Sequence, residues 1–201
     1  FECIQGEGGV NNLDYNFVKA IEKLAKEKDI LMVVDEVQTG NGRTGRYFAY
    51  ENFDIKPDIV STAKGLAGGL PMGAVLFGEK VKDTVTPGSH GSTFGGNPVC
   101  AAGAISIVSR IDDEFLKSVR EKSEYIKNFL MNIKGVKSVS GMGLMLGVET
   151  QKDAKQIASE CLENGLLVLT AKTKIRLLPA LNISYLELDR GLKILKEVIE
   201  K

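Results

Sequence analysis

The sequence has little histidine and little cysteine, which limits the sites that it can build. Its 201 residues include one histidine, His90, and three widely spaced cysteines, Cys3, Cys100 and Cys161. A structural zinc site needs four such ligands close together, and these four residues are so scattered that a site would be hard to assemble. A Ser-His-Asp hydrolase would have to use His90, and the nucleophile motif GxSxG is absent. An odd, scattered set of cysteines argues against a disulfide framework and favours a reducing, cytoplasmic location.

The sequence also lacks net charge and long apolar runs. Lysine plus arginine and aspartate plus glutamate each number 26, so the charges cancel. Nucleic-acid binding needs a clustered positive excess, and no such partner is expected. No apolar run approaches the roughly 20 residues that cross a bilayer, so no membrane partner is expected either. Apolar residues still make up 43% of the chain, enough for a sizeable buried core.

The first half of the chain alternates helical patterns with short apolar runs. Helices are predicted over residues 15–28 and 98–111, the second of them buried, and strands over 30–34, 58–64 and 73–78. Continuous apolar runs, rather than alternation, favour a parallel or mixed sheet that helices cover on both faces. This half is therefore predicted to be α/β.

The pattern changes near residues 109–113, where we expect a domain boundary. The predicted strands beyond it are short, and helices separate them. Helices are predicted over 112–133, 153–163 and 187–201, and strands over 136–139, 145–148, 166–169 and 175–178. The sequence therefore predicts a first domain over residues 1–110 and a smaller α+β domain over 111–201.

An acid and a lysine lie at the ends of two neighbouring predicted strands. Asp35 follows the apolar run of residues 30–34, and Lys64, in the segment SerThrAlaLysGly at 61–65, ends the next predicted strand. Ligands gather at the carboxyl ends of strands in such sheets. This pairing is typical of pyridoxal phosphate enzymes, in which the lysine forms a Schiff base with the cofactor aldehyde and the acid keeps the pyridine nitrogen protonated. Each residue alone has a plainer interpretation, a strand-end turn acid or a surface lysine in a glycine-rich loop.

Three further places carry candidate chemistry. Residues 91–98 place hydroxyl groups before a predicted helix, which suits either a phosphate site or a simple helix cap. Arg176 lies in an apolar strand, either snorkelling at an edge or gripping a carboxylate with two parallel bonds. Glu7, in GlnGlyGluGlyGly, is a loop acid or an active-site acid.

Taken together, these residues resemble the class III, fold-type-I pyridoxal phosphate aminotransferases. The matching segments are ValValAspGluValGlnThrGly at 33–40, GlyArgThrGly at 42–45, ProAspIle at 57–59 and AlaLysGly at 63–65, in the family's order and spacing. Residues 69–74, 90–98 and 141–147 are most similar to its acetylornithine branch. The resemblance implies the C-terminal part of the family's large domain, with a mostly parallel sheet and helices on both faces, followed by the small α+β domain.

The resemblance also assigns the cofactor site. Lys64 would form the Schiff base with pyridoxal 5'-phosphate (PLP) and move the proton between the substrate α-carbon and the cofactor C4′. Asp35 would bind the pyridine nitrogen, and Gln38 the 3-oxygen of the ring. Glu36 and Val37, between them, belong to the same cofactor-binding segment.

The remaining implied roles concern the substrate and the subunit interface. Thr93 would reach the phosphate of the cofactor held by a neighbouring subunit, which implies a homodimer with shared active sites. Ser92 would lie beside the substrate. Arg176 would take the α-carboxylate of glutamate or 2-oxoglutarate, and Glu7 would cover this arginine when the substrate presents an amine.

The implied reaction is transamination between N2-acetylornithine and 2-oxoglutarate. Two alternatives stay open. One is another ω-amino substrate, namely ornithine, succinylornithine, 4-aminobutyrate or an aminoadipate derivative. The other is a non-catalytic fragment that retains the fold.

The chain departs from the family in two ways. Cys3 stands where the family usually has proline, which leaves the site residues unchanged. Family members are also about twice as long, and their N-terminal half carries the phosphate-binding loop and the residue stacked on the ring. Because the chain opens at Phe1 inside a predicted strand, we expect a segment before it and poor cofactor binding by this portion alone.

Overall fold

The computed structural model describes residues 1–201, which divide into two compact units. Unit 1 comprises residues 1–3, 13–42 and 46–115, and unit 2 comprises 4–12, 43–45 and 116–201. The predicted boundary near residue 111 had placed residues 4–12 and 43–45 in the first domain. Both segments belong to unit 2. Residues 4–12 do so because Ile4 and Val10 pack into one apolar cluster with Met145 and Ala171.

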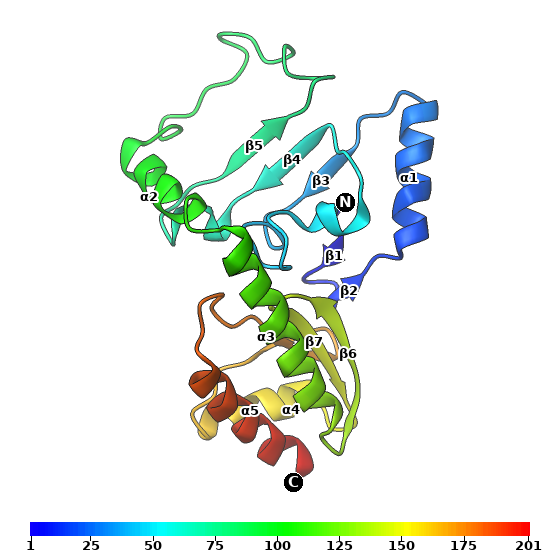
Figure 1. Ribbon diagram of the computed structural model, residues 1–201, viewed down its shortest axis with the longest axis vertical. Coiled ribbons are helices and arrows are strands. Elements are labelled where there is room, and N and C mark those ends of the chain that lie inside the picture. Colours follow the sequence, from blue (N-terminus) through cyan, green and yellow to red (C-terminus); the bar gives the residue numbers. More distant parts are fainter. The chain divides into compact units, whose positions relative to one another are not determined.

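Unit 1 is built on a three-stranded mixed sheet. Its strands, in spatial order, are β3 (Val33–Asp35), β4 (Ile59–Thr62) and β5 (Ala74–Phe77) (Figure 1). β3 and β4 are parallel, whereas β4 and β5 are antiparallel. The other elements are α1 (Tyr15–Glu27), η1 (Ala49–Phe53), η2 (Lys64–Ala67) and α2 (Pro98–Val108). The predicted elements are present, although the strand expected from residue 30 begins only at Val33 and the strand expected to end at Lys64 ends at Thr62.

Burial in unit 1 differs from the prediction. A sheet covered on both faces was expected, but Val33, Val75 and Phe77 are 44–54% exposed. The predicted buried helix α2 buries only Ala104, which packs with Leu66 and Ala67 of η2. A helix that is apolar all round needs cover on every side, and residues 1–201 supply that cover on one side only.

Helix α1 begins where the sequence predicts. The Asp14 carboxylate accepts a hydrogen bond from the Phe17 backbone amide at 2.9 Å and so satisfies one of the free donors of the first turn. Farther along, the buried Glu22 accepts a bond from the backbone amide of Lys56, which fixes the helix against the segment before β4. None of the helices combines the length and apolar character needed to cross a membrane.

Unit 2 contains a four-stranded antiparallel sheet. Its strands, in spatial order, are β6 (Val136–Met142), β7 (Met145–Thr150), β9 (Lys174–Leu177) and β8 (Leu169–Ala171). The helices are α3 (Asp113–Met131), which starts in unit 1, α4 (Ala154–Glu163) and α5 (Tyr185–Glu200). The short strands β1 (Ile4–Gln5) and β2 (Asn11–Asn12) form an antiparallel pair.

The two faces of this sheet make different contacts. Successive residues of a strand point to opposite faces, so the pairing of β7 with β9 shows which side chains share a face. Leu146, Val148 and Ile175 share one face and are fully buried in the core. The opposite face carries Lys174 and Arg176 and lies against residues 4–12. Strand β9 thus directs two cationic side chains, Lys174 and Arg176, toward residues 4–12.

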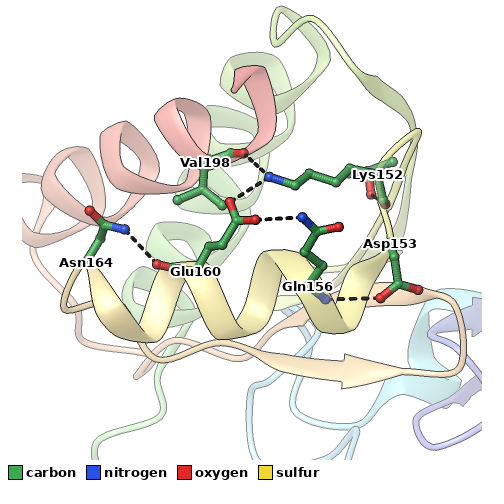
Figure 2. A network of polar contacts seen from close by, with 7 residues as sticks. Lys152, Asp153, Gln156, Glu160, Asn164 and Val198 are labelled. Carbon is green, nitrogen blue, oxygen red and sulfur yellow. Dashed lines mark hydrogen bonds and ion pairs between the residues drawn. The ribbon is translucent and has the colours of Figure 1, made fainter.

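Polar side chains join α4 to the end of α5 (Figure 2). The Lys152 ammonium donates to Glu160 Oε2 at 2.6 Å and to the Val198 carbonyl oxygen at 3.2 Å. Gln156 donates to the second Glu160 oxygen at 2.9 Å. Asp153 caps α4 by accepting from the backbone amide of Gln156 at 3.0 Å. These bonds satisfy helix-end groups and keep unit 2 compact.

Candidate active site

Asp35 lies at the carboxyl end of β3, and only one of its two carboxylate oxygens accepts hydrogen bonds within the chain. Ser61 is its register partner on β4. Asp35 Oδ1 accepts from the Val37 backbone amide at 2.9 Å and from Ser61 Oγ at 3.2 Å. Oδ2 makes no hydrogen bond within the chain. The Asp35 side chain is exposed in this chain. The arrangement is an oriented acid with one oxygen available to a ligand.

Lys64 follows β4 by two positions and has an unusual backbone. Its φ is +48°, in the left-handed region, which costs a non-glycine residue roughly 1–2 kcal/mol. The Asn41 side-chain amide supports this turn by donating to Thr62 Oγ1 at 3.0 Å and to the Ala63 carbonyl oxygen at 3.1 Å. The Lys64 side chain is exposed and has no ion pair within the chain. Backbone strain of this kind clusters at functional sites.

Lys64 and Asp35 come from adjacent parallel strands, at the ends where ligands bind in such sheets. Sequence reasoning found both residues but missed two neighbours that position them. Ser61 orients the acid, and Asn41 braces the lysine turn. The signal for Ser61 was present, because parallel pairing sets it opposite Asp35 once the two strands are aligned.

Glu36, next to Asp35, has its carboxylate directed into the protein. It is fully buried and accepts from Thr39 Oγ1 at 2.5 Å and from the backbone amides of Ala49 and Tyr50 at 3.0 and 2.9 Å. Desolvation raises the pKa of Glu36, against the effect of these donors. Its carboxylate closes the loop between β3 and η1 and offers no oxygen to a cofactor. The cofactor-binding role of Glu36 therefore stays a sequence prediction without structural support.

Val37 and Gln38 follow Glu36 and are half-buried. The Val37 backbone amide donates to Asp35 Oδ1. The cofactor-binding roles of Val37 and Gln38 stay sequence predictions.

Cys3, where the resemblance led us to expect proline, is fully buried. Burial, with a contribution from the charge of Glu36, raises the pKa of the Cys3 thiol to about 12. The thiol therefore stays protonated at neutral pH and is an inert core group.

The segment before α2 leaves its hydroxyl groups exposed. Asn97 caps the helix by accepting from the backbone amides of Val99 at 3.0 Å and Cys100 at 3.3 Å. The helix cap is therefore the Asn97 side chain and not one of the hydroxyl groups. Ser92 and Thr93 are exposed in the preceding loop. Their proposed contacts with substrate and with a neighbouring subunit's cofactor remain predictions.

Arg176 forms a second polar group, in unit 2. Its side chain is 10% exposed and Nη1 donates to Glu7 Oε1 at 2.6 Å, while Glu7 is 73% exposed. Arg176 Nε is buried without a hydrogen-bond partner. β9 is an inner strand of the sheet, so the snorkelling interpretation is wrong. A buried guanidinium with an unused donor is suited to a carboxylate ligand.

The sequence model of the class III aminotransferases, "Aminotransferase class-III", matches residues 1–199. The chain belongs to the class III aminotransferase family. This confirms the resemblance drawn from residues 33–65. Enzymes of this family are PLP-dependent aminotransferases, which agrees with an acid and a lysine at adjacent strand ends.

Curated relatives of the class III family include several acetylornithine aminotransferases. The enzyme of Haemophilus ducreyi is 48% identical over 202 residues, which cover 100% of this chain and 51% of that protein. The enzyme of Aquifex aeolicus is 46% identical over 98% of this chain and 52% of its own length. The chain spans about half the length of the curated relatives that it matches.

Solved structures of the family share the fold. The N-acetylornithine aminotransferase of Stenotrophomonas maltophilia superposes with a TM-score of 0.90 at 38% identity, covering 98% of this chain and 54% of that one. An ornithine aminotransferase of Plasmodium yoelii gives a TM-score of 0.90 at 32% identity, covering 100% and 56%. The predicted α/β fold of a PLP transferase is thereby confirmed.

Proposed function

We propose that this chain is part of an enzyme that transfers an amino group between N2-acetylornithine and 2-oxoglutarate. The observation that carries the proposal is the pairing of Asp35, with one free carboxylate oxygen, and the unpaired Lys64 at the ends of parallel neighbours. The names of the relatives at 41–48% identity favour acetylornithine as the amine donor. We place the enzyme in the cytoplasm, which its three free cysteines support.

The residues of unit 1 fit PLP. When bound, PLP supplies an electron sink for the negative charge that develops on the substrate carbon. Asp35 Oδ2 is the oxygen that would hold the pyridine N–H, since Val37 and Ser61 already engage Oδ1. A carboxylate pinned in this way would keep that nitrogen protonated. Gln38 would donate to the ring 3-oxygen.

Lys64 would attach the cofactor and act as the proton carrier. Its ammonium has no partner in the chain, so no ion pair must break before it reacts. The lysine side chain is long and flexible, which suits moving a proton from the substrate α-carbon to C4′. Asn41 would keep the backbone of the lysine turn fixed while the side chain moves.

Arg176 and Glu7 would select the two substrates. For glutamate or 2-oxoglutarate, the guanidinium would bind the α-carboxylate after Glu7 has left it. For the acylated diamine, Glu7 would stay on Arg176, as in the structure, and neutralise it. One buried cation would then serve a dicarboxylate and an amine in turn. Ser92 would lie beside the substrate.

A second candidate function is ornithine transamination. The ornithine aminotransferases among the matched structures are 31–32% identical, with TM-scores of 0.87–0.90, against 38% and 0.90 for the N-acetylornithine aminotransferase of Stenotrophomonas maltophilia. The Arg176–Glu7 pair is compatible with either amine. The two candidates therefore differ in the amine donor and not in the chemistry of Lys64.

A substrate panel tests the proposed function. The protein is expressed from its whole gene, and borohydride is used to fix the cofactor on its lysine before peptide mass spectrometry. We expect the label at Lys64 and its loss in Lys64→Ala, with Lys80→Ala as a surface control. Single-turnover rates should be highest with N2-acetylornithine, and higher rates with ornithine would support the second candidate. A lack of label at Lys64 in the whole protein would refute both.

We further propose a homodimer in which Thr93 binds the phosphate of the partner's cofactor. Thr93 lies exposed in the loop before α2, and the neighbouring Phe94 is 83% exposed. Mixing inactive Lys64→Ala and Thr93→Ala subunits should restore activity, because one site of each mixed dimer is then intact. Random exchange would return about a quarter of the wild-type activity. If activity does not return although mixed dimers form, Thr93 serves its own subunit.

A further inference from the structure

A second cation lies beside Arg176 and holds the loop that carries Glu7. Lys174 is two positions earlier on β9 and therefore projects from the same face of the sheet. Its ammonium donates to Asn11 Oδ1 at 3.0 Å and to Ser140 Oγ at 3.0 Å. Lys174 thus connects the sheet to residues 6–11, here called the Glu7 loop.

Two backbone hydrogen bonds within the Glu7 loop are long. The backbone amides of Gly9 and Val10 reach the Gly6 carbonyl oxygen only at 3.4 Å, at the long end for a hydrogen bond. Val10 adopts a φ of +52°, which is strained for a β-branched residue. The Asn11 side chain donates to the Gly8 carbonyl oxygen at 2.9 Å. Asn11 therefore links Lys174 to Gly8, the residue after Glu7.

The sheet makes room for this contact at Gly147. A methyl group there would lie 2.8 Å from Val10 Cβ, 3.0 Å from Ser140 Oγ and 3.2 Å from Lys174 Cδ. The register sets Gly147 directly opposite Arg176 on β9. The absence of a side chain lets the Lys174 stem and Val10 pack over the strand next to the arginine.

We propose that Lys174 is a positioning residue that holds the Glu7 loop closed over Arg176 and so sets the affinity of the site for dicarboxylates. This inference rests on the proposed function, in which Arg176 takes the α-carboxylate of glutamate or 2-oxoglutarate. A dicarboxylate must displace Glu7, so every contact that stabilises the closed loop weakens its binding. Loss of Lys174 should therefore strengthen dicarboxylate binding, although it removes a positive charge.

Glutarate, an unreactive dicarboxylate, is a suitable probe for the whole protein loaded with cofactor. In Lys174→Met the glutarate Kd should fall roughly five-fold, the effect expected when a typical hydrogen-bonded anchor of the closed state is lost. The KM for the amine donor should rise by a smaller factor, since most molecules stay closed. Lys174→Arg should restore both values, and Lys172→Met, at the exposed hairpin tip, should change neither.

The Asn11→Ala variant separates two effects of Lys174, its hydrogen bond to the Glu7 loop and its positive charge. It removes the hydrogen bond between Lys174 and Asn11 and keeps the Lys174 ammonium. It should strengthen glutarate binding as Lys174→Met does, and it provides the test if that variant fails to fold. The inference is overturned if Lys174→Met behaves like Lys172→Met. It is also overturned if Lys174→Met weakens glutarate binding while Asn11→Ala does not, since Lys174 would then bind the ligand itself.

Arg176→Met distinguishes failure of this inference from failure of the proposed function. If Arg176→Met leaves the glutarate Kd unchanged, Arg176 does not bind the carboxylate, and the proposed role of the arginine fails together with that of Lys174. If Arg176→Met abolishes glutarate binding and Lys174→Met has no effect, only the role of Lys174 fails.

Discussion

Arg176 donates from Nη1 to Glu7 Oε1 at 2.6 Å, although 169 positions separate the two residues in the sequence. The buried Nε of the same guanidinium has no partner. The pair is therefore incomplete: one carboxylate uses part of a donor group that can hold a ligand in two parallel bonds. The Arg176 guanidinium is thus a cation that the Glu7 carboxylate can cover or leave open to a ligand.

Replacing Arg176 by lysine should raise the KM for 2-oxoglutarate more than the KM for the amine donor. Lysine keeps the charge but loses the planar fork, so the KM for 2-oxoglutarate should rise roughly 10- to 100-fold. The KM for the amine donor should change little, because this substrate does not use the fork. Half-reaction kinetics on the whole protein measure both values, with Arg190→Lys as an exposed control on α5. An equal rise for both substrates would contradict the assignment.

Ser61→Ala should weaken cofactor binding without changing the fold. The Ser61 hydroxyl is one of two donors that hold Asp35 Oδ1, and its removal lets the carboxylate rotate away from the pyridine nitrogen. A hydrogen bond of this kind contributes about 1 kcal/mol, so the PLP Kd should rise roughly five-fold. Equilibrium dialysis of the whole protein measures the change. Ser89→Ala, which loses only a bond to the Thr86 carbonyl oxygen, should leave the Kd unchanged.

Glu22 should make the stability of unit 1 depend on pH in the acid range. Burial acts to raise the pKa of this carboxyl, but bonds from Lys19, Lys26 and the Lys56 amide outweigh it and lower the pKa from 4.5 to about 2. The stabilisation is complete above pH 4.5 and is lost as the pH falls from 4.5 towards 2. Urea unfolding between pH 6 and 3 should show this decline, and Glu22→Gln should flatten it. The exposed Glu27→Gln on the same helix should not.

The sequence was sufficient for those features that depend on short spacing. The motifs from Val33 to Gly65 predicted the acid and the lysine, and Asp14 predicted the start of α1, which its bond to the Phe17 amide confirms. Each of these signals lies within a strand end or a single helical turn. Local rules therefore located the residues of unit 1 that carry the proposed chemistry.

The sequence was insufficient where the answer depends on which way a side chain points or on distant segments. Asp35 and Glu36 are adjacent acids, and only the strand pleat and the loop that follows decide that Glu36 is the buried one. The placement of Glu7 against Arg176 requires residues 4–12 to pack on a sheet formed more than 120 positions later. No local pattern encodes that pairing.

Gly143→Ala should destabilise unit 2 more than the glycine backbone alone explains. Gly143 has a φ of +56°, and a methyl group there would lie 2.3 Å from the Arg43 carbonyl oxygen. The Arg43 side chain donates to the carbonyl oxygens of Leu144 and Pro179, and these bonds oppose a displacement of the Arg43 segment. Gly165 is a matched control, with a φ of +80° and nothing within 4 Å of the added methyl. Gly165→Ala should cost about 1 kcal/mol for its backbone, and Gly143→Ala roughly 1–3 kcal/mol more for the clash. Urea unfolding of both variants measures the difference, and equal losses would show that the loop yields to the methyl group.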